Sequence, residues 1–260
     1  TIRMLVGLIS QTSGDVTKRG VNLRKNKEKA LKNVGAVVEN PELYKYLSGR
    51  ENLMQIARIR KVSKQEVEEL IKLVGLQDRI DDKVRKYSLG MKQRLGLAAA
   101  LIGNPKLLIL DEPTNGLDPS GIIDFRNIVK SLARKNNMAV FVSSHILSEV
   151  QQLCDKVAFI NEGIIKAEEE MEKAIYGTER ESLTLMTNDD EEKVFKALRN
   201  QPFVLTSSKL GNGINIVIDS GTAPQLIKAL VKEDVLVEEI FKNREGLEQR
   251  YMELVEGGIR

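Results

Sequence analysis

Three short apolar runs recur along the first two thirds of the chain, and segments with helical patterning separate them. The runs are Val34–Val38, Leu107–Leu110 and Ala139–Val142. Continuous apolar runs of strand length that alternate with helices predict a parallel sheet buried on both faces. An earlier segment, Ile2–Ile9, is expected to form a helix, with a loop after it. This pattern indicates an α/β fold.

The segment between residues 41 and 103 is predicted to be helical. Ser63 and Glu66 have the spacing of a capping box, and Gly75 follows the apolar stripe as a stop signal. Ser88 can cap a further helix, which Gly103-Asn104-Pro105 is expected to end. We therefore assign residues 41–103 to a helical subdomain.

The pattern changes after about residue 173. The expected order there is strand, helix, strand, strand, helix, strand, which is the ferredoxin-like arrangement. The predicted segments are Ser182–Met186, Asp190–Arg199, Phe203–Ser207, Ile214–Ile218, Ala223–Val231 and Val235–Ile240. The chain is thus predicted to contain a first domain over residues 1–173, closed by a hairpin around Asn161-Glu162, and a small α+β domain over 174–260.

Composition narrows the classes of function. Lys and Arg total 40 against 37 Asp and Glu, a net charge of +3, which argues against a nucleic-acid partner. The lone Cys154 cannot form an intrachain disulfide, which fits a reducing cytosol. No run approaches the roughly 20 apolar residues that a membrane-spanning helix needs. Any membrane role is therefore expected to depend on a partner.

Two carboxylates follow the second apolar run. Asp111 and Glu112 would lie at the carboxyl edge of the parallel sheet, where such folds bind ligands. The alternative is a strand that ends in a polar turn, since Asp-Glu-Pro can open one. A second feature is the helix start at Ser88, whose hydroxyl and backbone N–H groups, with Gly90, can form an anion site. The alternative there is an ordinary capped helix.

Together these motifs resemble the ATP-binding proteins of ABC transporters. Leu107–Glu112 matches the Walker B pattern, and Ser88–Arg94 is a variant of the LSGGQ signature. Thr114–Asp118 resembles the D-loop that follows Walker B in this family. The resemblance implies a P-loop NTPase-like ABC ATPase domain that binds ATP and Mg²⁺, followed by the ferredoxin-like domain.

The resemblance also implies roles for individual residues. Asp111 would hold Mg²⁺, Glu112 would polarise the attacking water, and His145 would contact the γ-phosphate. Glu39 stands where the family usually has the Q-loop glutamine, and it would reach the same Mg²⁺ and water. This substitution resembles the branch of transporters linked to bacitracin and lantibiotic resistance.

The signature is expected to act on the nucleotide held by a second subunit. Ser88, Leu89, Gly90 and Met91 would bind the γ-phosphate across a homodimer, although Leu89 and Met91 replace the family's Gly and Gln. Asp118 would lie at the seam between the two sites. The segment Tyr44–Arg60 lies where the family's integral membrane permease docks. The resemblance implies a cytoplasmic protein, peripheral on the inner face of the cell membrane through that permease.

The resulting hypothesis is the ATP-binding subunit of an exporter of drugs or peptide antibiotics. The family's phosphate-binding loop does not occur in the 260 residues. We therefore expect the chain to hydrolyse little ATP. We also expect it to be a truncated product, because a sheet that begins in mid-helix would leave an exposed hydrophobic edge. The alternatives are an impaired cassette that serves as an interaction module, and a soluble ABC ATPase outside transport.

Overall fold

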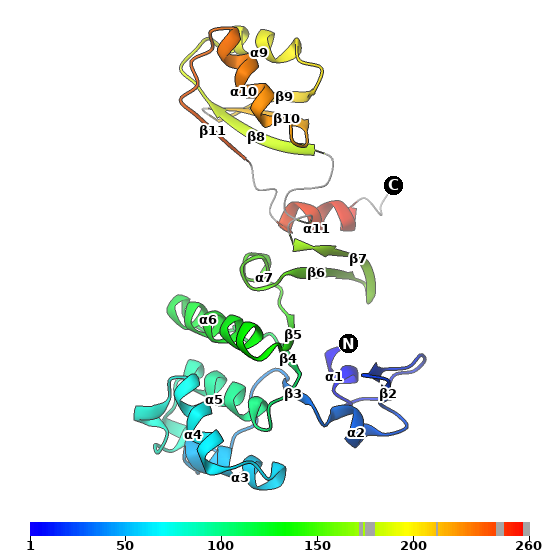
Figure 1. Cartoon of the computed structure of the whole chain (residues 1–260), viewed down its shortest axis with the longest axis vertical. Helices are drawn as coiled ribbons and strands as arrows, with labels where there is room; N and C mark the ends of the chain where they lie inside the picture. Colours follow the sequence, from blue (N-terminus) through cyan, green and yellow to red (C-terminus); the bar gives the residue numbers. More distant parts are fainter. Residues whose placement is uncertain (172–173, 175–179, 212, 243–246, 257–260) are drawn as a thin grey trace. The chain divides into compact units, whose positions relative to one another are not determined.

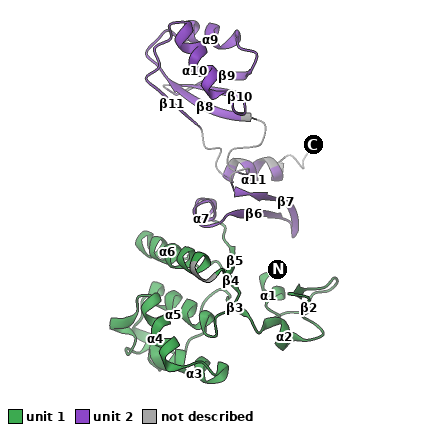
Figure 2. Cartoon of the chain, in the orientation of Figure 1, with its two compact units in different colours: residues 1–145 green, residues 146–260 purple. Residues whose placement is uncertain are grey.

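The chain divides into two compact units, residues 1–145 and residues 146–260 (Figure 2). The computed structural model describes residues 1–171, 174, 180–211, 213–242 and 247–256. The predicted domain boundary between residues 173 and 174 falls beside residues outside these ranges and stays a prediction.

The first unit is built on a three-stranded parallel sheet (Figure 1). Its order is β3-β4-β5, with β3 at Val34–Val37, β4 at Leu107–Asp111 and β5 at Ala139–Ser143. Val37 pairs with Leu110, and Leu110 pairs with Val142. The predicted parallel sheet is confirmed, and all three strands end at one edge.

Burial differs among these strands. The central residues of β4, Leu108 to Leu110, are buried, whereas Phe141 of β5 is 42% exposed. The prediction that the apolar runs are buried on both faces therefore holds for β4 and is wrong for β5. The exposure alternates along β5, since Ala139 and Phe141 are exposed while Val140 and Val142 are partly buried, so only one face of this strand is covered.

Helices and a short hairpin surround the sheet. The helices are α1 (Ile2–Leu5), α2 (Lys27–Leu31), α3 (Gly49–Arg60), α4 (Lys64–Leu73), α5 (Leu89–Leu101) and α6 (Pro119–Asn136), with 3-10 turns η1 (Gln77–Arg79) and η2 (Val84–Lys86). The hairpin joins β1 (Thr17–Lys18) to β2 (Val21–Asn22). Among the helices of the described residues, none is long and apolar enough to cross a membrane.

The first helix is shorter than predicted. It ends at Leu5 instead of Ile9, because Gly7 adopts a left-handed conformation with φ +70°. The N–H of Leu8 then returns to the carbonyl of Arg3 at 2.8 Å, and that of Gly7 to Met4 at 3.0 Å. This is the Schellman pattern, which closes a helix at glycine.

The predicted helix signals of the helical subdomain are confirmed. Ser63 and Glu66 form a capping box at the start of α4, and Gly75 follows its end with φ +65°. The Ser88 hydroxyl accepts a hydrogen bond from the Met91 N–H at 3.2 Å at the start of α5. Short-range chemistry thus sets where these helices begin and end.

Two glycines let α5 approach its neighbours closely. A Cβ atom on Gly35 of β3 would lie 2.2 Å from the carbonyl oxygen of Ala100, and one on Gly96 would lie 2.4 Å from Cγ of Pro41. Real Cβ atoms do not tolerate such distances, so α5 packs directly on β3 and on the segment that follows it. The start of α5 is thereby fixed relative to the sheet.

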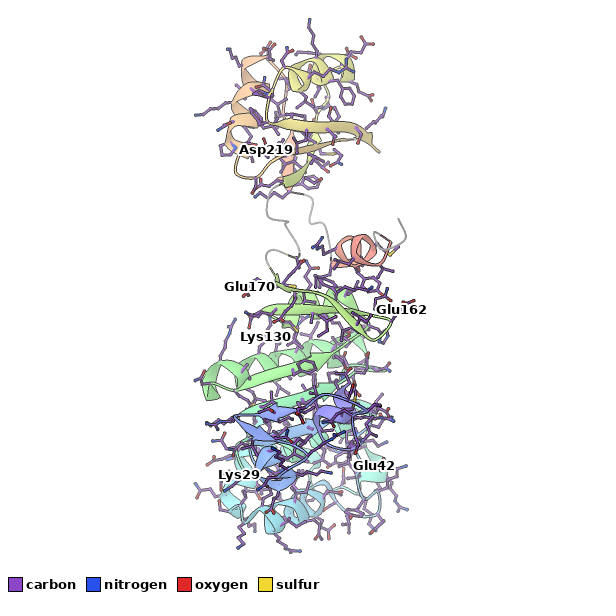
Figure 3. The ribbon with its side chains drawn as sticks, turned by 90° about the vertical axis from the view of Figure 1, so that its right-hand side faces the viewer. Lys29, Glu42, Lys130, Glu162, Glu170 and Asp219 are labelled. Atoms are coloured by element: carbon purple, nitrogen blue, oxygen red, sulfur yellow. The ribbon has the colours of Figure 1, made fainter. Side chains whose placement is uncertain are left out.

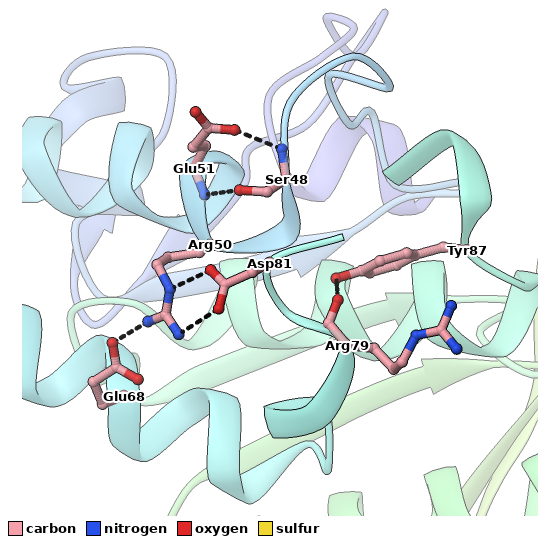
Figure 4. Close-up of polar contacts among 7 residues, drawn as sticks. All are labelled: Ser48, Arg50, Glu51, Glu68, Arg79, Asp81 and Tyr87. Carbon is pink, nitrogen blue, oxygen red and sulfur yellow. Dashed lines mark hydrogen bonds and ion pairs between the residues drawn. The ribbon is translucent and has the colours of Figure 1, made fainter. Parts of the chain in front are cut away.

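An ionic network ties the helical subdomain together (Figure 4). The Nε of Arg50, at the start of α3, donates to Asp81 Oδ1 at 2.7 Å, and Nη1 donates to Glu68 of α4. Nearby, the Tyr87 hydroxyl donates to the carbonyl of Arg79 at 2.7 Å. The residue before Ser88 is therefore anchored to η1.

Removal of the Asp81 charge should weaken this network. The hydrogen bond from Arg50 holds the pKa of Asp81 below its ordinary value. A carboxyl with a lowered pKa stabilises the fold above its unfolded pKa of about 3.9, and this contribution is lost as the pH falls through the folded pKa. Asp81→Asn should therefore unfold at lower urea concentration at pH 7, and the difference from the original protein should shrink below pH about 4.

The matched control is Asp78→Asn, which removes a carboxylate from η1 and leaves the two Arg50 contacts in place. Urea midpoints at several pH values between 3 and 7 provide the measurement. Equal midpoints for Asp81→Asn and Asp78→Asn across this range would contradict the stabilising role of the Arg50–Asp81 pair.

The second unit begins with a helix and a hairpin. They are α7 (Leu147–Leu153), β6 (Lys156–Asn161) and β7 (Ile164–Glu170). The hairpin is confirmed, although its turn is Glu162-Gly163, one residue later than predicted, with φ +50° and +76°. Figure 3 shows Glu162 and Glu170 at opposite ends of the hairpin. A final helix, α11 (Leu247–Glu256), buries Leu247 with Val157 and Phe159.

The predicted ferredoxin-like arrangement is confirmed in the rest of this unit. Its elements are β8 (Arg180–Met186), α9 (Glu191–Arg199), β9 (Val204–Leu210), β10 (Gly213–Asp219), α10 (Ala223–Lys232) and β11 (Glu239–Lys242). The sheet has the order β11-β8-β10-β9, and every neighbouring pair is antiparallel. Leu198 of α9 and Leu226 of α10 are fully buried in the core that these strands share.

The last predicted strand begins too early. Val235 is buried, but the strand β11 starts only at Glu239. The Leu236 N–H donates to the Asp189 carboxylate at 2.6 Å, and the Leu236 carbonyl accepts from the Thr187 hydroxyl at 2.6 Å. Side chains therefore satisfy this backbone in place of a strand partner, and the apolar pattern alone could not reveal that.

Candidate functional site

The carboxyl ends of β4 and β5 bring Asp111 and Glu112 next to Ser143. The Ser143 hydroxyl donates to Asp111 Oδ1 at 2.6 Å. The backbone N–H of Glu112 donates to the Ser143 carbonyl at 3.2 Å and lies 3.1 Å from its hydroxyl oxygen. Glu112 itself has φ +47°, which turns the chain out of the strand.

His145 lies against Glu112. Its Nδ1 is 2.8 Å from Glu112 Oε2, and the two side chains are 66% and 34% exposed. The structure therefore brings together two of the three residues with a predicted catalytic role. Both remain open enough to solvent to meet a ligand.

Glu39 follows β3 at the same edge of the sheet. Because Val37 pairs with Leu110, Glu39 and Glu112 each stand two residues beyond a paired position. The carboxylate of Glu39 forms an ion pair with Arg3, and its backbone is left-handed, with φ +59°. The structure thus places Glu39 at the predicted edge, with a cationic partner that sequence reasoning did not anticipate.

The start of α5 lines a separate hollow of about 390 Å³. Ser88, Leu89 and Gly90 form part of its wall, and Asp118 forms another part. Asp118 caps α6, since its Oδ1 accepts from the Gly121 N–H at 3.1 Å. Met91 is not among the lining residues; its backbone N–H binds the Ser88 hydroxyl.

The structure brings Glu112 together with His145, and it places Ser88, Leu89, Gly90 and Asp118 around one hollow. Glu39 pairs with Arg3 instead, and Met91 does not line the hollow. Among the described residues, no hydrogen bond or ion pair joins Ser88 or Asp118 to the Asp111–Glu112 edge. None of Asp111, Glu112 and His145 lines the hollow at the start of α5.

The Asp111 carboxylate uses one of its two oxygens in the contacts at this edge. Asp111 uses Oδ1 for the bond to Ser143, and its Oδ2 makes no hydrogen bond within the described part of the chain. No group of three or more His, Cys, Asp or Glu side chains converges as a metal site among these residues.

Sequence reasoning missed Ser143 as a member of the site. Its pairing partner in the sheet is Asp111, so the hydroxyl faces the carboxylate only through the parallel register. The available signal was a polar residue at the end of an apolar strand, two positions before His145.

The chain resembles known proteins over nearly its whole length. Residues 1–115 match the family model described as "ABC transporter". The uncharacterized ABC transporter ATP-binding protein YhcH of Bacillus subtilis (strain 168) is 44% identical over 256 residues, which cover 98% of this chain and 82% of that protein. The bacitracin transport ATP-binding protein BcrA of Bacillus licheniformis is 40% identical over 261 residues, covering 99% and 84%.

The chain belongs to the ATP-binding proteins of ABC transporters. A solved ATP-binding subunit of an ABC transporter has a TM-score of 0.59 at 27% identity and covers 66% of this chain and 73% of its own. The fold similarity confirms the predicted α/β ABC ATPase fold.

Family membership identifies this ABC protein as the ATP-binding subunit of a transporter. Its similarity to BcrA confirms the predicted resemblance to the bacitracin branch. Strand β4 ends at the predicted Walker B residues Asp111 and Glu112, and α5 begins at the predicted signature. ABC ATP-binding proteins hydrolyse ATP as a class, so these two places are where this subunit's chemistry is expected.

Proposed function

We propose that this subunit couples ATP hydrolysis in a head-to-tail homodimer to the export of a drug or peptide antibiotic through a separate membrane permease. The observation that supports it best is the Glu112–His145 contact at 2.8 Å on the sheet edge, with the signature at a separate place. In a head-to-tail dimer, the Asp111–Glu112 edge of one chain would face the signature of the other chain.

Each residue of the edge has a role in this proposal. Asp111 would hold Mg²⁺, which would neutralise charge on the transferred phosphate. Glu112 accepts a proton from the attacking water, and His145 orients the Glu112 carboxylate and meets the γ-phosphate. Glu39 stands at the same edge and adds a negative charge, which Arg3 offsets.

The signature residues serve the nucleotide of the opposite chain. The Ser88 oxygen accepts from the Met91 N–H, so its own proton remains able to donate to a phosphate oxygen. The N–H groups of Leu89 and Gly90 stand at the positive end of a 13-residue helix, which favours an anion. Asp118 lies in the same hollow and would connect the two sites at the seam.

The similarity to BcrA supports a peptide antibiotic as the exported substrate. The permease would contact the surface that precedes and includes α3. Tyr44 and Tyr46 are 56% and 68% exposed there, and their ring centroids lie 6.0 Å apart. Paired exposed aromatic rings are common anchors in protein interfaces. This contact would keep the subunit on the inner face of the cell membrane.

Turnover tests the proposed function. The 260 residues contain no Gly-x-x-x-x-Gly-Lys-Ser/Thr run, so by themselves they should release phosphate from ATP slowly. A longer form that carries such a loop before residue 1 should hydrolyse ATP with a dependence on Mg²⁺. Absence of turnover in the longer form would contradict the enzyme proposal and favour an interaction module. Rapid turnover by residues 1–260 alone would contradict the proposed impairment.

A further inference from the structure

One hydroxyl group contacts both carboxylate residues of the sheet edge. Ser143 ends β5 and pairs in register with Asp111, which ends β4. Its hydroxyl donates to Asp111 Oδ1 at 2.6 Å and lies 3.1 Å from the Glu112 nitrogen, from which it accepts. A hydroxyl has one proton and two lone pairs, so it can do both at once.

The bond to Asp111 is short because the acceptor is charged. Hydrogen bonds from a hydroxyl to a carboxylate are typically about 2.5–2.7 Å long and roughly twice as strong as neutral ones. Because the Ser143 hydroxyl binds Oδ1, the Asp111 carboxylate is held in one orientation. Its Oδ2 atom is then left for a metal ion. Groups behind a metal ligand commonly fix its orientation in this way.

The hydrogen bond between the Glu112 N–H and the Ser143 hydroxyl stabilises an otherwise unfavourable backbone conformation of Glu112. A non-glycine residue in the left-handed region costs about 1–2 kcal/mol, and Glu112 has φ +47°. Its N–H is shared between the carbonyl and the hydroxyl of Ser143, at 3.2 and 3.1 Å. That conformation is the one in which the Glu112 carboxylate meets His145.

We propose that Ser143 is a positioning residue of the hydrolytic site, which orients the Asp111 carboxylate for the metal and holds the Glu112 backbone in its left-handed conformation. The inference rests on the proposed roles of Asp111 and Glu112. Ser143 touches no reacting atom; it acts through these two residues.

The sharpest variants are Ser143→Thr and Ser143→Val, whose side chains have nearly the same shape and differ by a hydroxyl. Both are β-branched and suit a strand. Ser143→Ala is the third variant, and Ser208→Ala, an exposed serine of β9, is the control for the loss of a hydroxyl elsewhere. Thermal unfolding checks that each variant folds.

The first measurement needs no nucleotide. Amide hydrogen exchange of Glu112, followed by NMR in residues 1–260, reports its N–H directly. A hydrogen bond of this kind contributes about 0.5–1.5 kcal/mol, so exchange should be about 2- to 10-fold faster in Ser143→Val and Ser143→Ala. Ser143→Thr and Ser208→Ala should match the original chain. Equal exchange in Ser143→Thr and Ser143→Val would overturn the proposed role toward Glu112.

The second measurement concerns the metal. The protein used is the longer form that carries the phosphate-binding loop (the loop-bearing form), with ATP. Mn²⁺ titrations followed by electron paramagnetic resonance give its metal affinity independently of turnover. Ser143→Val should weaken Mn²⁺ binding about tenfold, the lower end of the effect seen for groups behind a metal ligand, and Ser143→Thr should restore it. Unchanged affinity in Ser143→Val would overturn the proposed role toward Asp111.

Glu112→Gln, assayed in parallel, separates the two proposals. If Glu112→Gln stops turnover while Ser143→Val leaves exchange and Mn²⁺ affinity unchanged, only the role of Ser143 fails. If Glu112→Gln leaves turnover intact, the proposed hydrolytic function fails.

Discussion

Glu112→Gln should bind ATP and form a stable dimer, yet release phosphate at least about 100-fold more slowly, since a positioned general base contributes 10²- to 10⁴-fold. The amide has the size of the carboxylate but cannot accept a proton from water. The backbone N–H that binds Ser143 is unchanged, so the local fold should persist. Phosphate release and light scattering with ATP, in the loop-bearing form, measure the two effects.

The control for this substitution is Glu162→Gln, which alters an exposed carboxylate in the β6–β7 turn. It should leave turnover and dimerisation unchanged. His145→Ala removes the partner of Glu112. It should reduce turnover without an ATP-trapped dimer, because the proposed contact of His145 with the γ-phosphate would also be lost. Normal turnover in Glu112→Gln would remove this residue from the catalytic role.

Local signals in the sequence predicted much of the fold. The helix starts at Ser63 and Ser88 were predictable because a capping hydroxyl acts within three residues of its own position. The parallel sheet followed from apolar runs alone. Where a side chain from a distant segment replaces a strand partner, as at Leu236, the same pattern gave a strand that begins too early.

The candidate site was predictable in its residue types and only partly in its contacts. Asp111, Glu112 and His145 follow apolar runs, so their meeting at one edge could be expected from parallel strands. The Ser143 hydroxyl and the Arg3–Glu39 ion pair depend on register and on side-chain conformation across segments far apart in sequence. The Arg3–Glu39 pair leaves no periodic or spacing signal in the sequence. For Ser143 the sequence offered its place at the end of an apolar run, but not the contact that its hydroxyl makes.

Gly90→Asp should abolish the ATP-dependent dimer and reduce turnover at least about 100-fold, which corresponds to about 2.7 kcal/mol of activation free energy. The monomer should remain as stable as before. A Cβ atom at Gly90 would have one neighbour, Leu117 Cδ2 at 3.7 Å, which is ordinary contact. Asp in the first turn of a helix is stabilising by about 0.3–1 kcal/mol. The same carboxylate would face the γ-phosphate of the opposite nucleotide, and opposed like charges cost several kcal/mol.

Gly90→Ala is the matched control, because it adds the Cβ without the charge. It should retain dimerisation and most turnover, and both variants should unfold at or above the original temperature. If Gly90→Asp unfolds at a lower temperature than the original protein, its defect is one of folding. A Gly90→Asp protein that dimerises normally with ATP would remove the start of α5 from the nucleotide site.

Mixing the two inactive variants tests the head-to-tail arrangement itself. In a Glu112→Gln/Gly90→Asp dimer, one site combines the intact Glu112 of one chain with the intact Gly90 of the other, and the second site has both defects. An equal mixture should therefore regain at most about a quarter of the original turnover. A quarter is the value for random pairing, in which half of the dimers are mixed and each has one intact site of two; trapped Glu112→Gln dimers and the weak pairing of Gly90→Asp would lower it. If Glu112 and Gly90 served the same nucleotide from one chain, neither chain of the mixed dimer would hold an intact pair, and the mixture would remain inactive.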